Sequence, residues 1–217
     1  MTRTSLAFLN EQIELNEQLL AGRERMFNPQ DLPGRYGRAV RAIDHLLQAT
    51  KCEAVLGGGW AVWHHGFAER LTQDLDIALP AGRVDEFLQV ASVSGFIIVP
   101  RAKGRWPKLV HKETGVKVDI RPEGGRPPTA SKPAPTTIPS PRRMGARGSI
   151  LRYMSLNSLV ELKLAAGREK DKADVIVLLL ANQEKIDALR QHLTAVHPHY
   201  VTALDGLIQS AREQEDE

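Results

Sequence analysis

A short segment near residue 75 alternates carboxylates with apolar side chains, and this alternation constrains both its backbone and its orientation. The segment reads Asp74-Leu75-Asp76-Ile77-Ala78-Leu79, and Pro80 follows it. Successive side chains of a strand point to opposite faces, so we expect a strand with one polar face and one buried face. Asp74 and Asp76 then project together. The fold must bury one side of this strand while it keeps two like charges on the other.

Two further features accompany this strand. The glycines Gly57-Gly58-Gly59 follow the apolar run Ala54-Val55-Leu56, which predicts a buried strand, a tight turn and then a short helix from Trp60. Downstream, residues 109–112 and 116–120 predict two strands joined by a Glu113-Thr114-Gly115 turn. Asp119 interrupts the second of these, on the face opposite Val118 and Ile120.

These residues suggest a common chemistry. Two carboxylates held side by side repel each other, and a divalent cation such as Mg²⁺ offsets that repulsion. Asp119 on a neighbouring strand could complete a two-metal site, which activates an attacking oxygen and stabilises a leaving pyrophosphate. The glycine turn would bring backbone N–H groups and a helix N-terminus close to a phosphate. Each motif alone is weak, and a glycine run is more often only a tight turn. Their combination is more specific.

The chain divides by composition into four segments. Residues 1–50 predict helices, the first with Leu6, Leu9, Ile13, Leu19 and Leu20 on an amphipathic face. Residues 51–120 predict an α/β core, and residues 150–217 a helical C-terminal region. Residues 121–149 are rich in Pro, Gly, Ser and Thr, and predict a mobile loop that cannot bury a core. Its basic residues are Arg121, Arg126, Lys132, Arg142, Arg143 and Arg147, against one acid, Glu123. A solvated linker and a basic flap that holds a polyanion both stay open.

Composition places few limits on function. The formal net charge is +3 and the hydrophobic share 42%, which is ordinary for a globular protein and a weak argument for a nucleic-acid partner. The single cysteine, Cys52, excludes an intrachain disulfide and fits a reducing compartment. No segment approaches the ~20 apolar residues of a membrane span, and the first residues do not resemble a signal peptide. We therefore expect a cytoplasmic protein without a membrane partner.

In these residues the sequence resembles the DNA polymerase β-type nucleotidyltransferase superfamily. Within it, the likeness is to small bacterial members related to AbiEii-type toxins and to aminoglycoside- and lincosamide-modifying nucleotidyltransferases. It is carried by Gly57-Gly58-Gly59-Trp60-Ala61, by Arg70-x-Thr72-x-Asp74-x-Asp76, by Asp119, and by the later stretch from Leu159 to Val175. It covers roughly residues 51–182.

The resemblance implies a fold, a reaction and roles for the acidic residues. The fold is an α/β (α+β) mixed β-sheet core flanked by helices, with a helical C-terminal part. The reaction moves an NMP from an NTP, with Mg²⁺ or Mn²⁺, to a hydroxyl of a tRNA, a protein or a small molecule. Asp74 and Asp76 would bind both metals, and Asp119 would be the third ligand or the base. Gly57 and Gly58 would touch the phosphates. Many members have Ser at the position of Gly58, so the grip on the nucleotide is reduced here.

Four more residues are candidates for nucleotide binding. Arg70 would pin the carboxylate strand or reach phosphate, and Thr72 would face the same side as Asp74. In the later helical motif, Lys163 would offset triphosphate charge, while Asp174 would orient it or contact the base. The competing interpretation of Lys163 and Asp174 is an ordinary set of helix ion pairs.

A second class of function stays open. The chain could be a catalytically silent relative that binds nucleotide or RNA as a regulatory or antitoxin component. The resemblance also suggests a toxin–antitoxin or resistance context, with an antitoxin or toxin protein as partner. The intact set of three aspartates favours the enzyme, and the missing serine favours the silent relative.

Overall fold

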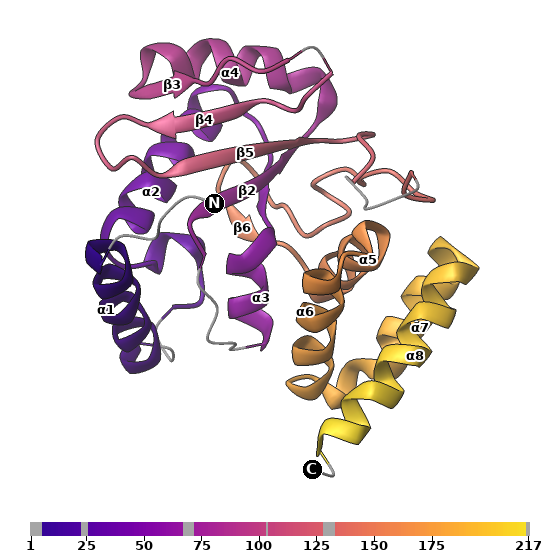
Figure 1. Cartoon of the computed structure of the whole chain (residues 1–217). Helices are drawn as coiled ribbons and strands as arrows, with labels where there is room; N and C mark the ends of the chain where they lie inside the picture. The colour runs from indigo at the N-terminus through magenta and orange to yellow at the C-terminus, as the bar shows by residue number, and fades with distance from the viewer. Residues whose placement is uncertain (1–5, 23–25, 67–71, 103, 128–132, 216–217) are drawn as a thin grey trace.

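A six-stranded mixed sheet forms the centre of the molecule, with helices packed on both of its faces (Figure 1). The computed structural model describes residues 6–22, 26–66, 72–102, 104–127 and 133–215. Across the sheet the strands run in the order β3-β4-β5-β2-β1-β6. Their bounds are Val55–Leu56 for β1, Asp74–Leu79 for β2, Phe96–Ile98 for β3, Lys108–His111 for β4, Lys117–Pro122 for β5 and Arg152–Tyr153 for β6. The strand that carries Asp74 and Asp76 therefore lies near the middle of the sheet.

The pairing of the strands confirms the predicted mixed α/β sheet. β2 is parallel to β5 and antiparallel to β1, while β1 is parallel to β6. β4 and β5 form the predicted antiparallel hairpin, and β3 extends it on the outer side. In the parallel pair of β2 with β5, Asp76 lies opposite Asp119. Two segments 43 residues apart in sequence thus bring their carboxylates to neighbouring positions.

The helices divide into groups around the sheet. The helix α3 follows β1, α4 links β2 to β3, and the last four helices form the predicted helical C-terminal region. In Figure 1, α5 to α8 lie together on one side of α3, and α1 and α2 lie on the other. The bounds are Leu6–Gly22 for α1, Gly34–Ala49 for α2, Gly58–Gly66 for α3, Val84–Val93 for α4, Leu156–Ala166 for α5, Glu169–Leu180 for α6, Ile186–Val196 for α7 and Pro198–Glu215 for α8. Among the described residues, no helix is long and apolar enough to cross a lipid bilayer.

The alternation along β2 separates two hydrophobic cores. Leu75, Ile77 and Leu79 are fully buried in a first core with residues of α2 and α4. On the other face, Ala78 belongs to a second core formed mainly by α5 to α8. Because side chains alternate, Asp74 and Asp76 lie on the same face as Ala78. The sheet thus presents its carboxylates toward the C-terminal helices.

The segment 121–149 departs from the predicted mobile loop. Beyond the end of β5 its described part has no helix or strand, yet Ala134, Ile138, Met144 and Ala146 are buried in the second core. The prediction that this stretch cannot bury a core was therefore wrong. Its apolar residues are spaced by prolines and glycines without helical or strand period, so they become a buried set only when turns fold them onto other elements.

The helix α1 forms as predicted, but the predicted apolar face is not the buried one. Leu6, Leu9, Ile13 and Leu20 are exposed, whereas Leu19 and the intervening Leu15 are buried in the first core. Apolar residues occur around much of this helix, so spacing alone could not select the packed side. As domain boundaries, the four predicted segments (1–50, 51–120, 121–149 and 150–217) stay a prediction, since β1, β2 and the C-terminal helices share the second core.

Candidate active site

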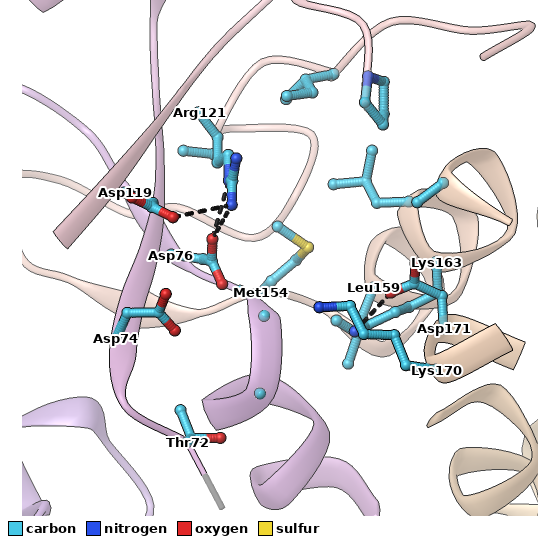
Figure 2. Close-up of a pocket in the computed structure, with 18 of the residues that line it drawn as sticks. Thr72, Asp74, Asp76, Asp119, Arg121, Met154, Leu159, Lys163, Lys170 and Asp171 are labelled. Atoms are coloured by element: carbon cyan, nitrogen blue, oxygen red, sulfur yellow. Dashed lines mark hydrogen bonds and ion pairs between the residues drawn. The ribbon is translucent and has the colours of Figure 1, made fainter. Parts of the chain in front are cut away.

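A cavity of about 500 Å³ lies between the sheet and the α5–α6 helices. Figure 2 shows the three carboxylates of Asp74, Asp76 and Asp119 on one side of it and residues of α5 and α6 on the other. Asp74 and Asp76 come from β2, and Asp119 comes from β5 next to it. Burial raises the pKa of Asp74, and the nearby charges of Asp76 and Asp119 raise it further. The strands therefore concentrate negative charge at one wall, in surroundings that disfavour it.

Two basic residues offset part of this charge. The Nε and Nη2 atoms of Arg121 both donate to Oδ1 of Asp76, at 2.9 and 2.5 Å, and Nη2 lies 3.4 Å from Oδ2 of Asp119. Lys108 on β4 places its Nζ 2.9 Å from Oδ1 of Asp119. Arg121 follows Asp119 by two residues on β5, so both side chains project to the same face of the sheet. The guanidinium lies between the two carboxylates in Figure 2.

The glycine turn presses against the carboxylate strand. Gly57 N–H donates to the carbonyl of Asp76 at 2.8 Å, and the backbone of Gly58 is left-handed, with φ +60°. A Cβ on Gly58 would meet Oδ2 of Asp76 at 2.1 Å, and one on Gly59 would meet Oγ1 of Thr72 at 2.2 Å. The turn therefore leaves room for backbone only. This explains why α3 begins at Gly58 rather than at the predicted Trp60: the left-handed glycine turns the chain directly from β1 into the helix.

The opposite wall is a buried ion cluster at the corner between α5 and α6. Ser155 caps the start of α5, and Gly167, with φ +61°, ends it, so that Lys163 in its last turn meets the first turns of α6. Lys163 Nζ lies 3.2 Å from Asp171 Oδ1 and also contacts Asp174.

Asp171 is the centre of this ion cluster. It is 1% exposed and accepts a second bond, from Arg168 Nε at 2.5 Å. Burial alone would raise the pKa of Asp171, but the hydrogen bond from Arg168 and the charge of Lys163 bring that pKa below its ordinary value. Asp171 is therefore ionised at neutral pH, and it fixes two of the cations that border the cavity.

Most of the candidate residues meet in this one cavity. Asp174 is the exception among the described ones: it is buried behind Lys163 and does not line the cavity. Arg70 lies outside the described residues. The candidates that line the cavity are Gly57, Gly58, Thr72, Asp74, Asp76, Asp119 and Lys163.

Arg121 and Trp106 belong to the site, although the sequence did not single out either as a site residue. Arg121 was grouped with the basic loop, although its spacing of two from Asp119 on a strand placed it on the carboxylate face. Trp106 lines the cavity and lies against Arg121, whose Cζ is 5.2 Å from its ring centroid. Nothing in the spacing of the sequence around Trp106 indicated this position.

The donor set fits a hard divalent cation. Carboxylate oxygens are the ligands that Mg²⁺ prefers. In this structure the positive charge of Arg121 pairs with two of the three carboxylates, those of Asp76 and Asp119. As the side chains lie, no group of three His, Cys, Asp or Glu within the described ranges is arranged to hold a metal ion. Asp74, Asp76 and Asp119 are the residues that would hold one.

Comparison with known proteins adds to this geometry. Residues 39–127 match the family model described as aminoglycoside-2''-adenylyltransferase. No curated protein matches the chain.

Two solved structures show a distant likeness. The crystal structure of ANT(2'')-Ia in complex with adenylyl-2''-tobramycin is 13% identical, with 82% of this chain and 97% of that chain covered and a TM-score of 0.41. The solution structure of the antibiotic-resistance factor ANT(2'')-Ia is 16% identical, with 82% and 95% covered and a TM-score of 0.38.

The family match spans less than half of the chain, but it includes the residues on which the site rests. The glycine turn and all three aspartates lie inside residues 39–127, whereas the ion cluster of α5 and α6 lies outside them. The predicted resemblance is thereby confirmed for the core. Residues 39–127 of the chain thus resemble the core of the aminoglycoside nucleotidyltransferases.

Proposed function

We propose that this protein transfers an NMP from an NTP to a hydroxyl group of a small-molecule antibiotic, in a reaction that requires Mg²⁺. The observation that carries the proposal is the cavity that Asp74, Asp76 and Asp119 line together with the glycine turn. The family match over the same residues supports nucleotidyl transfer and an aminoglycoside-like acceptor. The experiment described below also tests the predicted tRNA and protein acceptors. The predicted toxin or antitoxin partner stays a prediction.

The roles of the residues follow from their positions. Asp74, Asp76 and Asp119 would hold Mg²⁺, which when bound would offset the charge of the triphosphate. The backbone of Gly57 and Gly58 approaches the phosphates, because the turn has no side chain in the way. Asp119 accepts the proton of the acceptor hydroxyl, whose oxygen attacks the α-phosphorus. The bond from the α-phosphorus to its bridging oxygen breaks, and pyrophosphate leaves.

Lys163, Arg168 and Lys170 on the opposite wall contribute positive charge toward the triphosphate. All three line the cavity, and Asp171 holds the first two in place. This wall supports the nucleotide-binding role proposed for Lys163. Asp174 would act on the nucleotide only through Lys163, since it does not itself line the cavity.

The test uses each of the four common NTPs, labelled at the α-phosphate, with Mg²⁺ and separate pools of aminoglycosides, tRNA and protein. We expect one antibiotic to take up label. Asp76→Asn should lower its rate of labelling by more than about 100-fold, because a ligand of the metal is lost. The matched control is Asp85→Asn, which removes an exposed carboxylate from α4 and should leave the rate unchanged. Equal labelling by Asp76→Asn and the wild type would contradict the assignment.

One observation favours the silent alternative. Arg121 already pairs with Asp76 and Asp119, as in a site that has replaced its metal with a fixed cation. A protein of that kind would bind NTP without transferring any part of it. Nucleotide binding by calorimetry, combined with no label in any acceptor pool, would support this alternative and overturn the enzyme.

A further inference from the structure

The guanidinium of Arg121 lies beside Asp76 and Asp119, where a metal ion bound by both carboxylates would be expected. Oδ1 of Asp76 accepts two N–H bonds from it, and Oδ2 of Asp119 lies 3.4 Å from Nη2. The side chains of Asp76, Asp119 and Arg121 are 21%, 18% and 31% exposed. At this depth an ion pair is stronger than at an open surface, because water screens it less.

Oδ1 of Asp76 cannot contact both the guanidinium of Arg121 and a divalent metal ion. A divalent ion such as Mg²⁺ binds carboxylate oxygen at about 2.0–2.1 Å and needs the lone pairs that face it. Oδ1 of Asp76 already directs its lone pairs at the Nε and Nη2 atoms of Arg121. A guanidinium and a divalent ion in contact with one oxygen would also repel each other. Binding of a metal through Oδ1 of Asp76 therefore requires Arg121 to leave, and binding through Oδ2 would still be opposed by the charge of the nearby guanidinium.

In the same position Arg121 also contacts an aromatic ring at the edge of the cavity. Its Cζ is 5.2 Å from the ring centroid of Trp106, which is within the range of a cation–π contact. Trp106 is itself fixed against the backbone of the following loop, since a Cβ on Gly125 would meet its ring at 2.9 Å. The guanidinium could leave the carboxylates and keep its contact with this ring.

We propose that Arg121 is an internal cation that competes with the divalent metal for Asp76 and Asp119. It positions both carboxylates in the metal-free protein, and its departure accompanies the binding of metal. This inference rests on the proposed function, because it takes Asp74, Asp76 and Asp119 as the metal ligands. It adds that Arg121 sets how tightly the free protein binds metal.

The test is a titration of the full chain with Mn²⁺ in the absence of nucleotide, with free Mn²⁺ read by electron paramagnetic resonance. Arg121→Gln removes the competing charge, so we expect its Kd for Mn²⁺ to be at least about fivefold lower than that of the wild type. Arg105→Gln is the control: it removes the same charge from an exposed position next to Trp106, and should leave the Kd unchanged. A Kd for Arg121→Gln that is equal to or higher than the wild-type value would overturn the proposal, as would an equal decrease in Arg105→Gln.

A second variant covers the case in which Arg121→Gln does not fold, which circular dichroism would reveal. Arg121→Lys keeps the charge but cannot donate from two nitrogens to one oxygen. We expect a smaller decrease in the Kd, of about twofold, from weaker competition. No decrease in a folded Arg121→Lys, with Arg121→Gln unfolded, would count against the proposal.

The variant Asp74→Asn/Asp76→Asn separates this inference from the proposed function. Loss of Mn²⁺ binding in the double variant, with no gain in Arg121→Gln, would sink only the role of Arg121. Mn²⁺ binding that is the same in the double variant and the wild type would remove the metal site itself, and the proposed function with it.

Discussion

At the scale of single residues, Gly58 shows how closely the turn and the carboxylates are fitted. Its φ of +60° disfavours any side chain, and a Cβ there would lie 2.1 Å from Oδ2 of Asp76. A serine at this position, which the resemblance implies, would therefore displace Asp76 from its present place. Without the serine hydroxyl, we expect fewer side-chain contacts with the nucleotide. In exchange, the backbone of Gly58 lies closer to the carboxylate of Asp76 than a residue with a side chain could.

Substitution of Gly58 by alanine should therefore affect both stability and activity. We expect Gly58→Ala to lower the free energy of unfolding by about 1–2 kcal/mol, because alanine is strained at positive φ. Transfer activity should fall as well, since Asp76 must move. Urea denaturation and the labelling assay measure the two effects. Gly82→Ala is the control, because a Cβ added there would meet nothing within 4 Å, so the variant should change neither quantity. An active Gly58→Ala of wild-type stability would show that the turn is not constrained in this way.

At the scale of elements, the α5–α6 corner depends on one buried carboxylate. Asp171 pairs with Lys163 and Arg168 and is almost fully buried. Asp171→Asn should lower the free energy of unfolding by about 3 kcal/mol, because it removes the buried charge that pairs with both the buried Lys163 and Arg168. The control on the same helix is Glu169→Gln, whose side chain is 88% exposed and whose loss should cost less than about 0.5 kcal/mol.

The stability lost in Asp171→Asn should depend on pH, and the direction of that dependence follows from the pKa of Asp171. The pKa of Asp171 in the folded protein lies below its ordinary value of 3.8. Its contribution to stability is thus fully present above pH 3.8 and is lost as the pH falls from that value through the folded pKa. Thermal melting should therefore show a gap between the wild type and Asp171→Asn that is constant near neutral pH and shrinks in strong acid. A gap that widens in acid would contradict the assigned pairing.

The elements also show how far local sequence could predict the structure. Period and turn residues alone predict the strand Asp74–Leu79 and the β4–β5 hairpin. The packed side of α1 did not follow, because apolar residues surround that helix. The pairing of Asp76 with Asp119 required the order of the strands, which local sequence does not give.

At the scale of the whole molecule, the segment 121–149 joins parts that the sequence suggested were separate. Ile138 and Met144 share the second core with Ala78 of the sheet and Leu189 of α7. Thr136 adds a 2.7 Å hydrogen bond to the hydroxyl of Tyr200 in α8. The segment is thus a structural connection between the sheet and the C-terminal helices, and it forms one edge of the cavity through Pro127 and Ile138.

This arrangement predicts that a substitution in the loop destabilises the whole molecule. Met144 is fully buried, so Met144→Ala should lower the free energy of unfolding by about 2–4 kcal/mol through loss of buried surface and creation of a cavity. Unfolding in urea should remain a single transition by circular dichroism and by tryptophan fluorescence, because sheet and helices share the core that Met144 fills. The control is Ile150→Ala, directly after the segment, where the side chain is 45% exposed and the loss should be below about 1 kcal/mol. A Met144→Ala protein of wild-type stability, or one in which the two probes report separate transitions, would instead identify the segment as the solvated linker that its composition suggested.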